Sequence, residues 1–362
     1  MSVRSMRAAM LVFAITALAA LIGAGWAYHY ITEYPDQPMG SGGKPVKLVI
    51  PRGANFRQVL RRLDQAGLKT NQTALKLFAH YKGLAGKVRA GTYTLDSSTT
   101  PRKLLDTLVL GVPAPLVSVL IPEGKNMVEV AEILHKAKIA NRDKMLEAMR
   151  NVHLLRRLGV PGRTMEGFLF PDTYRLKAGT SPQEIMRVLY KRHKRVYYRI
   201  RKKYPKQLRW LRKRLGWGHF EIVTLASIVE KETGQSFERP RIANVFLNRL
   251  VFPRFRSRLL QTDPTIVYGC VVPEEKSAAC RKFKDRIRRI HLNDKDNPYN
   301  TYAHSGLPPG PIANPGKAAM EAVMAPEKGR YLYFVSKNDG THYFSKSVRE
   351  HERAVDKYQR GK

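Results

Sequence analysis

Cysteine is almost absent from this sequence of 362 residues, which contains only Cys270 and Cys280. Two cysteines cannot build the multi-bridge framework of a small secreted scaffold. Because no His or further Cys stands near them at ligand spacing, we expect no metal site. In an oxidising compartment the two could form one local disulfide, whereas in a reducing compartment both would remain free thiols.

Acidic residues are also scarce. The chain has 29 Asp and Glu against 65 Lys and Arg, which gives a formal net charge of +36. This imbalance predicts attraction to a polyanion, and the candidates are nucleic acid, anionic lipid headgroups and anionic cell-envelope polymers. A hydrophobic content of 43% allows a sizeable core, and the length allows two or three modules.

Residues 8–32 contain no Lys, Arg, Asp or Glu. A helix of this length spans a bilayer, and Arg4 and Arg7 place the preceding residues in the cytoplasm by the positive-inside rule. We therefore expect a single-pass membrane anchor, with the remainder of the chain on the side of the membrane away from the cytoplasm. A cleaved signal peptide is the alternative, since residues 17–20 offer small side chains for cleavage. The apolar run continues beyond them, which favours an uncleaved anchor.

An internal repeat follows a linker rich in Pro, Gly and Ser. Residues 46–63 match residues 117–134 at a constant offset, and each copy reads as a short strand, a Pro-x-Gly turn and an amphipathic helix. Such units are similar to the LysM-like modules that bind N-acetylated sugar chains. A generic strand-and-helix packing unit without a ligand is the alternative.

A strongly basic stretch lies within a predicted long helical region. Lys191 to Arg214 holds thirteen Lys or Arg and no acid, with Tyr198 and Trp210 among them. In the cytoplasm this pattern would indicate a nucleic-acid surface. Across a membrane, lipid headgroups or an anionic envelope polymer fit better.

The segment Leu225–Gly234 sets two carboxylates at the edges of an apolar helical arc. On a helical wheel Glu230 and Glu232 flank the arc, whereas Lys231 points toward water. Partial desolvation raises the pKa of a carboxyl group toward the range of a general acid. The alternative is a surface helix with a solvated Glu-Lys-Glu triplet, and the wheel does not choose between the two carboxylates.

Taken with this segment, the chain resembles the endolytic murein transglycosylases, the YceG-like family. The resemblance is carried by motifs in one order along nearly the whole chain: Glu166–Tyr174, Ala226–Thr233, Asn244–Leu250, Leu260–Gly269, Tyr299–Tyr302, Gly306–Ala313 and Tyr331–Val335. The strong basicity and the Cys-flanked insertion after Gly269 depart from the family pattern.

The resemblance implies a lyase of the bacterial inner membrane, with its catalytic domain on the periplasmic side. It would cut nascent peptidoglycan glycan strands and leave 1,6-anhydro-muramoyl ends, without a cofactor. By analogy, the catalytic acid is the first Glu of Val-Glu-Lys-Glu, which is Glu230 here, and Glu232 is a bystander or supporting group. The residues expected to bind or orient the sugar are Glu166, Gln261, Asp263, Asn300 and Tyr302. The implied partners are glycan strands, the membrane and cell-wall synthesis enzymes, and not nucleic acid.

The expected fold class is α+β, with a transmembrane helix, a LysM-like module and a helix-rich catalytic domain. A small antiparallel sheet in that domain should include a hairpin turning at Asn338-Asp339-Gly340. The expected order is a cytoplasmic N-terminus (1–7), an anchor (8–30), a linker (31–45), a LysM-like region (46–140) and a YceG-like catalytic domain (141–362). A non-enzymatic wall-binding anchor and a membrane-anchored nucleic-acid binder are the competing functions.

Overall fold

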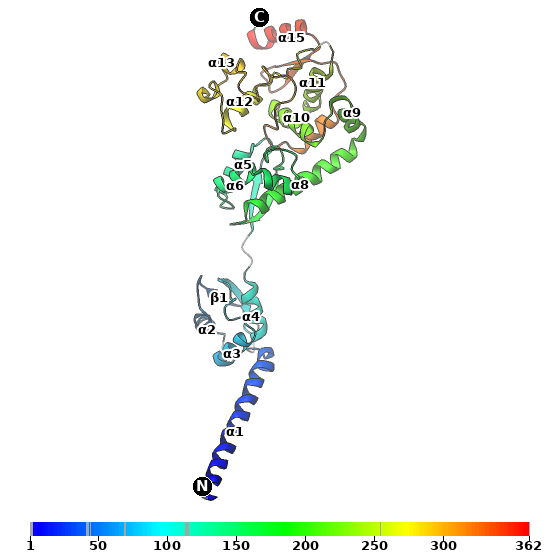
Figure 1. Cartoon of the computed structure of the whole chain (residues 1–362). Helices are drawn as coiled ribbons and strands as arrows, with labels where there is room; N and C mark the ends of the chain where they lie inside the picture. Colours follow the sequence, from blue (N-terminus) through cyan, green and yellow to red (C-terminus); the bar gives the residue numbers. More distant parts are fainter. Residues whose placement is uncertain are drawn as a thin grey trace. The chain divides into compact units, whose positions relative to one another are not determined.

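The computed structural model describes residues 3–40, 43, 45–68, 70–112, 116–253 and 255–361. The chain divides into two compact units, Met1–Ala114 and Pro115–Lys362. Figure 1 colours the first unit from blue to cyan and the second from cyan to red.

The first unit opens with helix α1 (Val3–Thr32). Its segment from Met10 to Asp36 has a mean hydropathy of 2.1, and by length and composition it could cross a membrane, as a signal sequence also could. The chain after α1 is not a free linker, because the Tyr34 hydroxyl donates to the Asn71 carbonyl and Arg102 pairs with Asp36 at 2.7 Å. Within the expected linker (31–45), the residues that directly follow α1 therefore contact the rest of the first unit.

A strand-and-helix module completes the first unit. Strand β1 (Pro45–Ile50) pairs antiparallel with β2 (Gly91–Asp96). Two helices, α2 (Phe56–Gln65) and α3 (Gln72–Tyr81), connect the strands, and α4 (Pro101–Leu110) follows β2. The inward side chains of the strands pack with those of the helices into one separate core.

The second unit begins with the same arrangement. Strand β3 (Leu116–Ile121) pairs antiparallel with β4 (Asp172–Lys177). Between them the chain forms three helices, and one long helix follows β4. These are α5 (Met127–Lys136), α6 (Arg142–Arg150), α7 (Val152–Leu158) and α8 (Pro182–Lys203).

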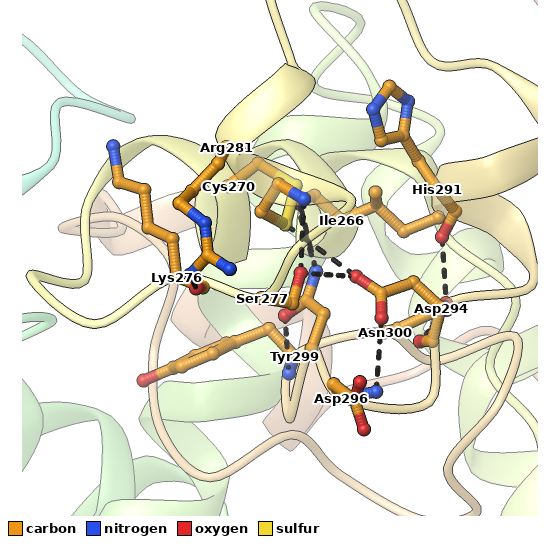
Figure 2. Close-up of a disulfide and its surroundings, with 12 residues drawn as sticks. Ile266, Cys270, Lys276, Ser277, Arg281, His291, Asp294, Asp296, Tyr299 and Asn300 are labelled. Atoms are coloured by element: carbon orange, nitrogen blue, oxygen red, sulfur yellow. Dashed lines mark hydrogen bonds between the residues drawn. A yellow bond between two sulfur atoms is a disulfide. The ribbon is translucent and has the colours of Figure 1, made fainter.

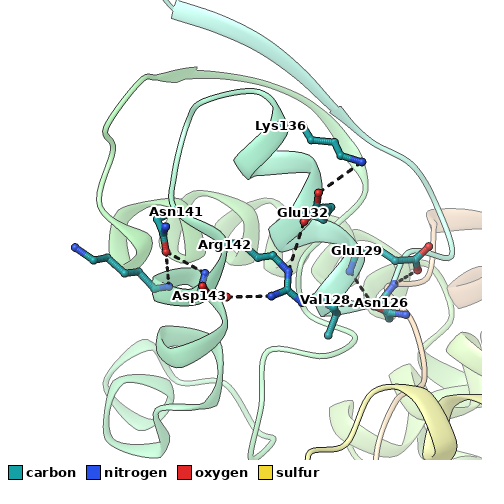
Figure 3. A network of polar contacts seen from close by, with 9 residues as sticks. Asn126, Val128, Glu129, Glu132, Lys136, Asn141, Arg142 and Asp143 are labelled. Atoms are coloured by element: carbon teal, nitrogen blue, oxygen red, sulfur yellow. Dashed lines mark hydrogen bonds and ion pairs between the residues drawn. The ribbon is translucent and has the colours of Figure 1, made fainter.

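The internal repeat therefore extends well beyond the two segments that reveal it in the sequence. Tyr93 lies opposite Leu48 in one sheet, and Tyr174 lies opposite Val119 in the other. In both copies the first helix begins with an Asn that forms a capping box, and Figure 3 shows the one at Asn126. The division at residue 114 falls inside the expected LysM-like region (46–140, with two related units), because the second copy packs into the core of the second unit. A sugar-binding role of the first copy stays a prediction.

The remainder of the second unit is mostly helical. Its elements are α9 (Pro205–Leu215), α10 (His219–Glu232), α11 (Arg239–Val251), α12 (Asp263–Val271), α13 (Arg289–Leu292), α14 (Lys317–Met324), β5 (Tyr333–Ser336), β6 (His342–Ser345) and α15 (Val348–Val355), with short 3-10 and π turns at Cys280–Lys282 and Asp356–Arg360. Strands β5 and β6 form the predicted hairpin, with Asn338 in the left-handed region at a φ of 65°. A helix-rich α+β fold with small antiparallel sheets is confirmed.

Helix α10 lies at the centre of the second unit (Figure 1) and contacts α11, α12 and α14. All residues from Ile222 to Val229 are buried. The polar Thr224 and Ser227 can be buried because their hydroxyls donate to backbone carbonyls of the same helix. The expectation of a one-sided apolar arc is therefore wrong, since α10 is buried all round from Ile222 to Val229 and is partly exposed only toward its two ends.

Candidate active site

The two carboxylates of the Val-Glu-Lys-Glu motif stand where α10 leaves the core. Glu230 and Glu232 lie in the last turn of the helix, and exposed Lys231 lies between them. Their surroundings differ, because each meets a different part of the chain.

Glu230 is held in a closed polar cluster. Its Oε1 accepts a hydrogen bond from the Arg239 guanidinium at 2.6 Å, and its Oε2 accepts one from the Gly316 amide at 2.9 Å. The two side chains of the ion pair are only 5% and 9% exposed. Arg239 also lies 3.8 Å from Glu123, in the turn after β3. Burial raises the pKa of Glu230, and the Gly316 amide and Arg239 oppose that rise. Both oxygens of Glu230 are thus occupied within the protein.

Glu232 is also removed from water, but its carboxyl group accepts fewer hydrogen bonds than that of Glu230. Its Oε1 accepts a hydrogen bond from the Thr262 hydroxyl, whereas its Oε2 accepts none from any described residue. Burial raises the pKa of the Glu232 carboxyl group to about 7. The negative charge of Asp263 adds to this rise, and the hydrogen bond from Thr262 opposes it. A carboxyl group with this pKa can hold a proton at neutral pH and can also release it.

Three further predicted residues gather near Glu232. Asp263, at the start of α12, accepts a hydrogen bond from the Tyr302 hydroxyl at 2.7 Å. Gln261 is exposed, with a φ of 50°, and its amide donates to the Thr301 carbonyl. The Leu-Gln-Thr-Asp and Tyr-Asn-Thr-Tyr motifs are therefore joined to each other beside Glu232, and not beside Glu230.

Glu166 lies deep in the protein, at 2% exposure. Its carboxyl group accepts hydrogen bonds from the Met127 amide, the Tyr268 hydroxyl and the Asn314 side chain. Burial raises its pKa to about 8. The group joins three segments: the start of α5, helix α12 and the loop before α14. Glu166 also lines a pocket of about 340 Å³ together with Phe220 and Tyr299, and direct sugar binding stays a prediction.

Asn300 is likewise fully buried. Its side-chain amide donates to the carbonyls of His291, Leu292 and Asp294, and its side-chain oxygen accepts from the Tyr302 amide. These hydrogen bonds hold the loop together and orient Tyr302. Direct substrate contact by Asn300 stays a prediction.

A cleft of about 580 Å³ has Asp263 in its lining, whereas Glu230 and Glu232 lie outside the residues that line it. Among the side chains that line it are Lys231, Asp263, Tyr268 and Arg286, and the turn at Gly124 forms part of its edge. Gly124 belongs to the second repeat copy, and its amide donates to the Asn314 carbonyl. That copy, expected in a separate LysM-like region, therefore supplies part of the candidate site.

The sequence reasoning missed two residues that set the difference between the carboxylates. Arg239 neutralises Glu230, and Thr262 donates to Glu232. Thr262 lies within the Leu260–Gly269 motif, so the sequence alone could have indicated it as a site residue. Arg239 offers no local signal, because its role depends on how α11 packs against α10.

The close packing of the Gly167 backbone against its neighbours explains why this position of the site is a glycine. Gly167 has a φ of +85°, and a Cβ there would lie 2.5 Å from the Pro311 ring and 2.9 Å from Val223. Only glycine fits at this position. It allows the loop that carries Glu166 to pack against both α10 and the Gly-Leu-Pro-Pro-Gly segment.

A disulfide joins Cys270, near the C-terminal end of α12, to Cys280. Figure 2 shows its surroundings, in which the Ser277 hydroxyl donates to Asp294 and its oxygen accepts from the Cys280 amide at 3.0 Å. The bond ties the insertion after Gly269 to the helix that carries Asp263. No group of three or more His, Cys, Asp or Glu in the described part of the chain is placed to hold a metal ion.

Removal of this bond should lower stability. For a loop of this length, we expect the double variant Cys270→Ser/Cys280→Ser to lose about 3 kcal/mol of unfolding free energy, because its unfolded state is no longer constrained. Urea denaturation of the oxidised parent and the variant measures the difference. The reduced parent is the control and should match the variant, so equal stability of all three forms would contradict the expectation.

Comparison with known proteins supports the identity of these motifs. The chain is 28% identical over 328 residues to an endolytic murein transglycosylase of Bacillus subtilis (strain 168), covering 86% of this chain and 84% of that protein. It is 28% identical to one from Streptococcus pneumoniae (strain R6), covering 93% of this chain and 63% of that protein.

A solved structure shares the fold. The crystal structure of a yceG-like protein from Listeria monocytogenes aligns with a TM-score of 0.54 and 28% identity, over 86% of this chain and 99% of that chain. The YceG-like family model matches residues 48–357, which include both repeat copies and all the motifs described above. The resemblance seen in the sequence is thus confirmed: the chain belongs to the YceG-like family.

Proposed function

We propose that this protein is an endolytic peptidoglycan lytic transglycosylase in which Glu232 is the single acid and base. The observation that carries the proposal is the carboxyl group at the end of α10, with a pKa of about 7 and one oxygen free of described hydrogen bonds. The named activity of the relatives supports the same reaction class.

The reaction needs only one carboxyl group. Protonated Glu232 donates its proton to the glycosidic oxygen between MurNAc and GlcNAc, and the bond from C1 to that oxygen breaks. The resulting carboxylate then removes the proton of the MurNAc 6-hydroxyl, whose oxygen bonds to C1 and closes the 1,6-anhydro ring. No water is consumed, so a second nucleophilic carboxylate is unnecessary.

Glu230 suits a supporting role better than the role of the acid. Burial raises the pKa of Glu230 as well, but the Arg239 guanidinium and the Gly316 amide oppose that rise because both interact with the charged form. Protonation of Glu230 would leave Arg239 without its 2.6 Å partner. We therefore assign the role of catalytic acid to Glu232. We assign to Glu230 the structural role of linking α10 to α11 and to the residue before α14.

The neighbouring polar groups can assist the reaction. Asp263 and Tyr302 form a bonded pair at the cleft, and exposed Gln261 lies beside them in sequence. Developing positive charge at C1 is stabilised by fixed dipoles or by the substrate's own N-acetyl group. These three side chains are our candidates for sugar contacts, with Glu166 and Asn300 holding the surrounding loops.

We further propose that α1 anchors the protein in the inner membrane, with the catalytic unit on the periplasmic side. The exposed apolar segment from Met10 to Asp36 supports an anchor. The disulfide between Cys270 and Cys280 supports an oxidising compartment. Nascent glycan strands and the enzymes that synthesise them would then be the partners within reach.

Product analysis tests the reaction class. Purified glycan strands incubated with the protein should yield internal cleavage products with anhydro ends, each one water lighter in mass spectrometry than a hydrolysis product. Products with free reducing ends would indicate a hydrolase instead. Sedimentation with peptidoglycan but no soluble product would indicate a wall-binding anchor.

The pH dependence should report the pKa of Glu232. Because its protonated form starts the reaction, we expect kcat/KM to fall about tenfold for each pH unit above roughly 7. The Glu230→Gln variant is the matched control and should keep the same midpoint. Initial rates on soluble glycan strands across pH 5 to 9 provide the measurement, and a rate that rises through pH 7 would contradict the assignment.

A further inference from the structure

The C-terminal half of α8 together with α9 forms a strongly basic surface, here called the basic face. The segment from Lys191 to Arg214 has no acidic residue. Twelve of its cations are exposed: Lys191, Lys194, Arg195, Arg199, Arg201, Lys202, Lys203, Lys206, Arg209, Arg212, Lys213 and Arg214. The thirteenth, Arg192, is half-buried and pairs with Asp172.

Little of this charge is neutralised within the protein. Lys203 lies 3.4 Å from Glu321, but Arg195, Arg199 and Arg209 form no ion pair with any described residue. Like charges placed so densely repel one another, and the helices are stable because their opposite sides are buried in the core. A surface of this kind attracts an extended anionic partner.

Aromatic and apolar groups accompany the charge. Tyr198 is 58% exposed, and the guanidinium of Arg201 lies 5.7 Å from the centre of its ring. Trp210, 39% exposed, lines a groove of about 860 Å³. The groove has Leu247, Val251, Phe252 and Met324 among its apolar lining, with Lys203, Lys206 and Lys328 among its cations.

The basic face is separate from the candidate active site. Figure 1 shows α9 and α12 on opposite sides of α10 within the second unit. A glycan strand at Asp263, on α12, would therefore leave the basic face free for a second partner.

We propose that the basic face binds the surface of a bilayer that contains anionic phospholipid. A membrane presents a continuous plane of phosphate groups, which matches cations spread along two helices. Exposed Trp and Tyr among Lys and Arg are typical of proteins at the boundary between headgroups and acyl chains. The groove beside Trp210 adds apolar surface for that boundary. Sugar rings and nucleic-acid bases can stack on Trp and Tyr one at a time, whereas a bilayer offers a continuous apolar layer beneath its phosphate groups.

Fluorescence quenching in nanodiscs tests this proposal. In a Trp26→Phe background the remaining tryptophans are exposed Trp210 and buried Trp217. The full chain is held in discs of brominated phosphatidylcholine, with or without phosphatidylglycerol. We expect strong quenching of Trp210 only in the discs that contain phosphatidylglycerol. Each Lys or Arg near such a surface changes the equilibrium constant for membrane binding about fivefold. The difference in quenching between the two kinds of disc should therefore be large, and high salt should abolish it.

Charge reversal supplies the control. The variant Arg195→Glu/Arg199→Glu/Lys202→Glu/Arg209→Glu should lose the quenching. Its matched control reverses four exposed cations elsewhere, Lys282, Lys284, Arg349 and Arg353, and should keep it.

Two outcomes would overturn the proposal. These are absence of quenching in anionic discs and quenching that survives reversal of the basic face. If quenching is absent and reversal weakens sedimentation with peptidoglycan or retention on DNA, the partner is that polymer. Anhydro-product formation is measured separately, so failure of this proposal leaves the catalytic assignment intact.

Discussion

A Glu232→Gln variant is expected to release no detectable anhydro-muropeptides, with kcat/KM lowered at least about a hundredfold. Glutamine keeps the shape of the side chain and can still accept the hydrogen bond from Thr262. It cannot give a proton to the glycosidic oxygen or take one back. Cleavage should therefore fail although the fold is retained.

The measurement is mass spectrometry of glycan strands digested by matched amounts of folded parent and variant. Circular dichroism and thermal melting establish that Glu232→Gln is folded. The matched control is Glu230→Gln, two residues earlier on the same helix, which should keep anhydro products at a reduced rate. If Glu232→Gln cleaved normally and Glu230→Gln did not, the roles of the two carboxylates would be exchanged and the reaction class would survive.

The second large effect concerns stability. We expect Arg239→Met to lose about 3–5 kcal/mol of unfolding free energy, because it leaves the buried Glu230 carboxylate without its partner. Both side chains of this pair are at most 9% exposed. Urea denaturation, with the midpoint and the slope fitted separately, measures the loss.

A neighbouring arginine on the same helix provides the control. Arg241 pairs with Glu327, but both side chains are more than a third exposed. Exposed ion pairs contribute little, so Arg241→Met should cost less than about 1 kcal/mol. The double variant Glu230→Gln/Arg239→Met should regain part of the loss, since no unpaired charge remains. Equal losses for Arg239→Met and Arg241→Met would contradict the importance of the buried pair.

Secondary-structure elements that are specified by neighbouring residues were predicted well from the sequence. The Asn338-Asp339-Gly340 turn and the hairpin that it joins follow from short-range turn chemistry. The long exposed helix at the N-terminus and the strand, turn and helix of each repeat copy also depend on neighbouring residues. In each case the pattern lies within a few residues of the structure that it specifies.

The sequence comparison detected only the first half of each repeat copy, and an insertion in the second copy explains why. The strands β2 and β4 share an inward Tyr and Leu, but α7 stands between α6 and β4 without a counterpart in the first copy. That insertion changes the offset between the copies. A constant-offset comparison therefore finds β1 and α2 with their partners and misses the returning strands.

The difference between Glu230 and Glu232 could not be obtained from a helical wheel. The wheel treats the environment as one apolar side and one aqueous side, whereas α10 is packed by three helices. Arg239 reaches Glu230 from α11, and Thr262 reaches Glu232 from the residue before α12. These contacts depend on tertiary packing, which no local pattern encodes.

The duplicated module has a consequence for how this enzyme arose. In the second copy the turn residue Glu123 lies beside Arg239, whereas Arg52 holds the corresponding place in the first copy. An arginine there would repel Arg239, so the first copy could not replace the second beside α10. If the two copies arose by duplication, they then acquired residues of opposite charge at this turn. The second copy would have become part of the catalytic unit, and the sequence of the first copy would have been free to diverge. Shorter descendants that keep only the second copy would retain every residue assigned here to the reaction.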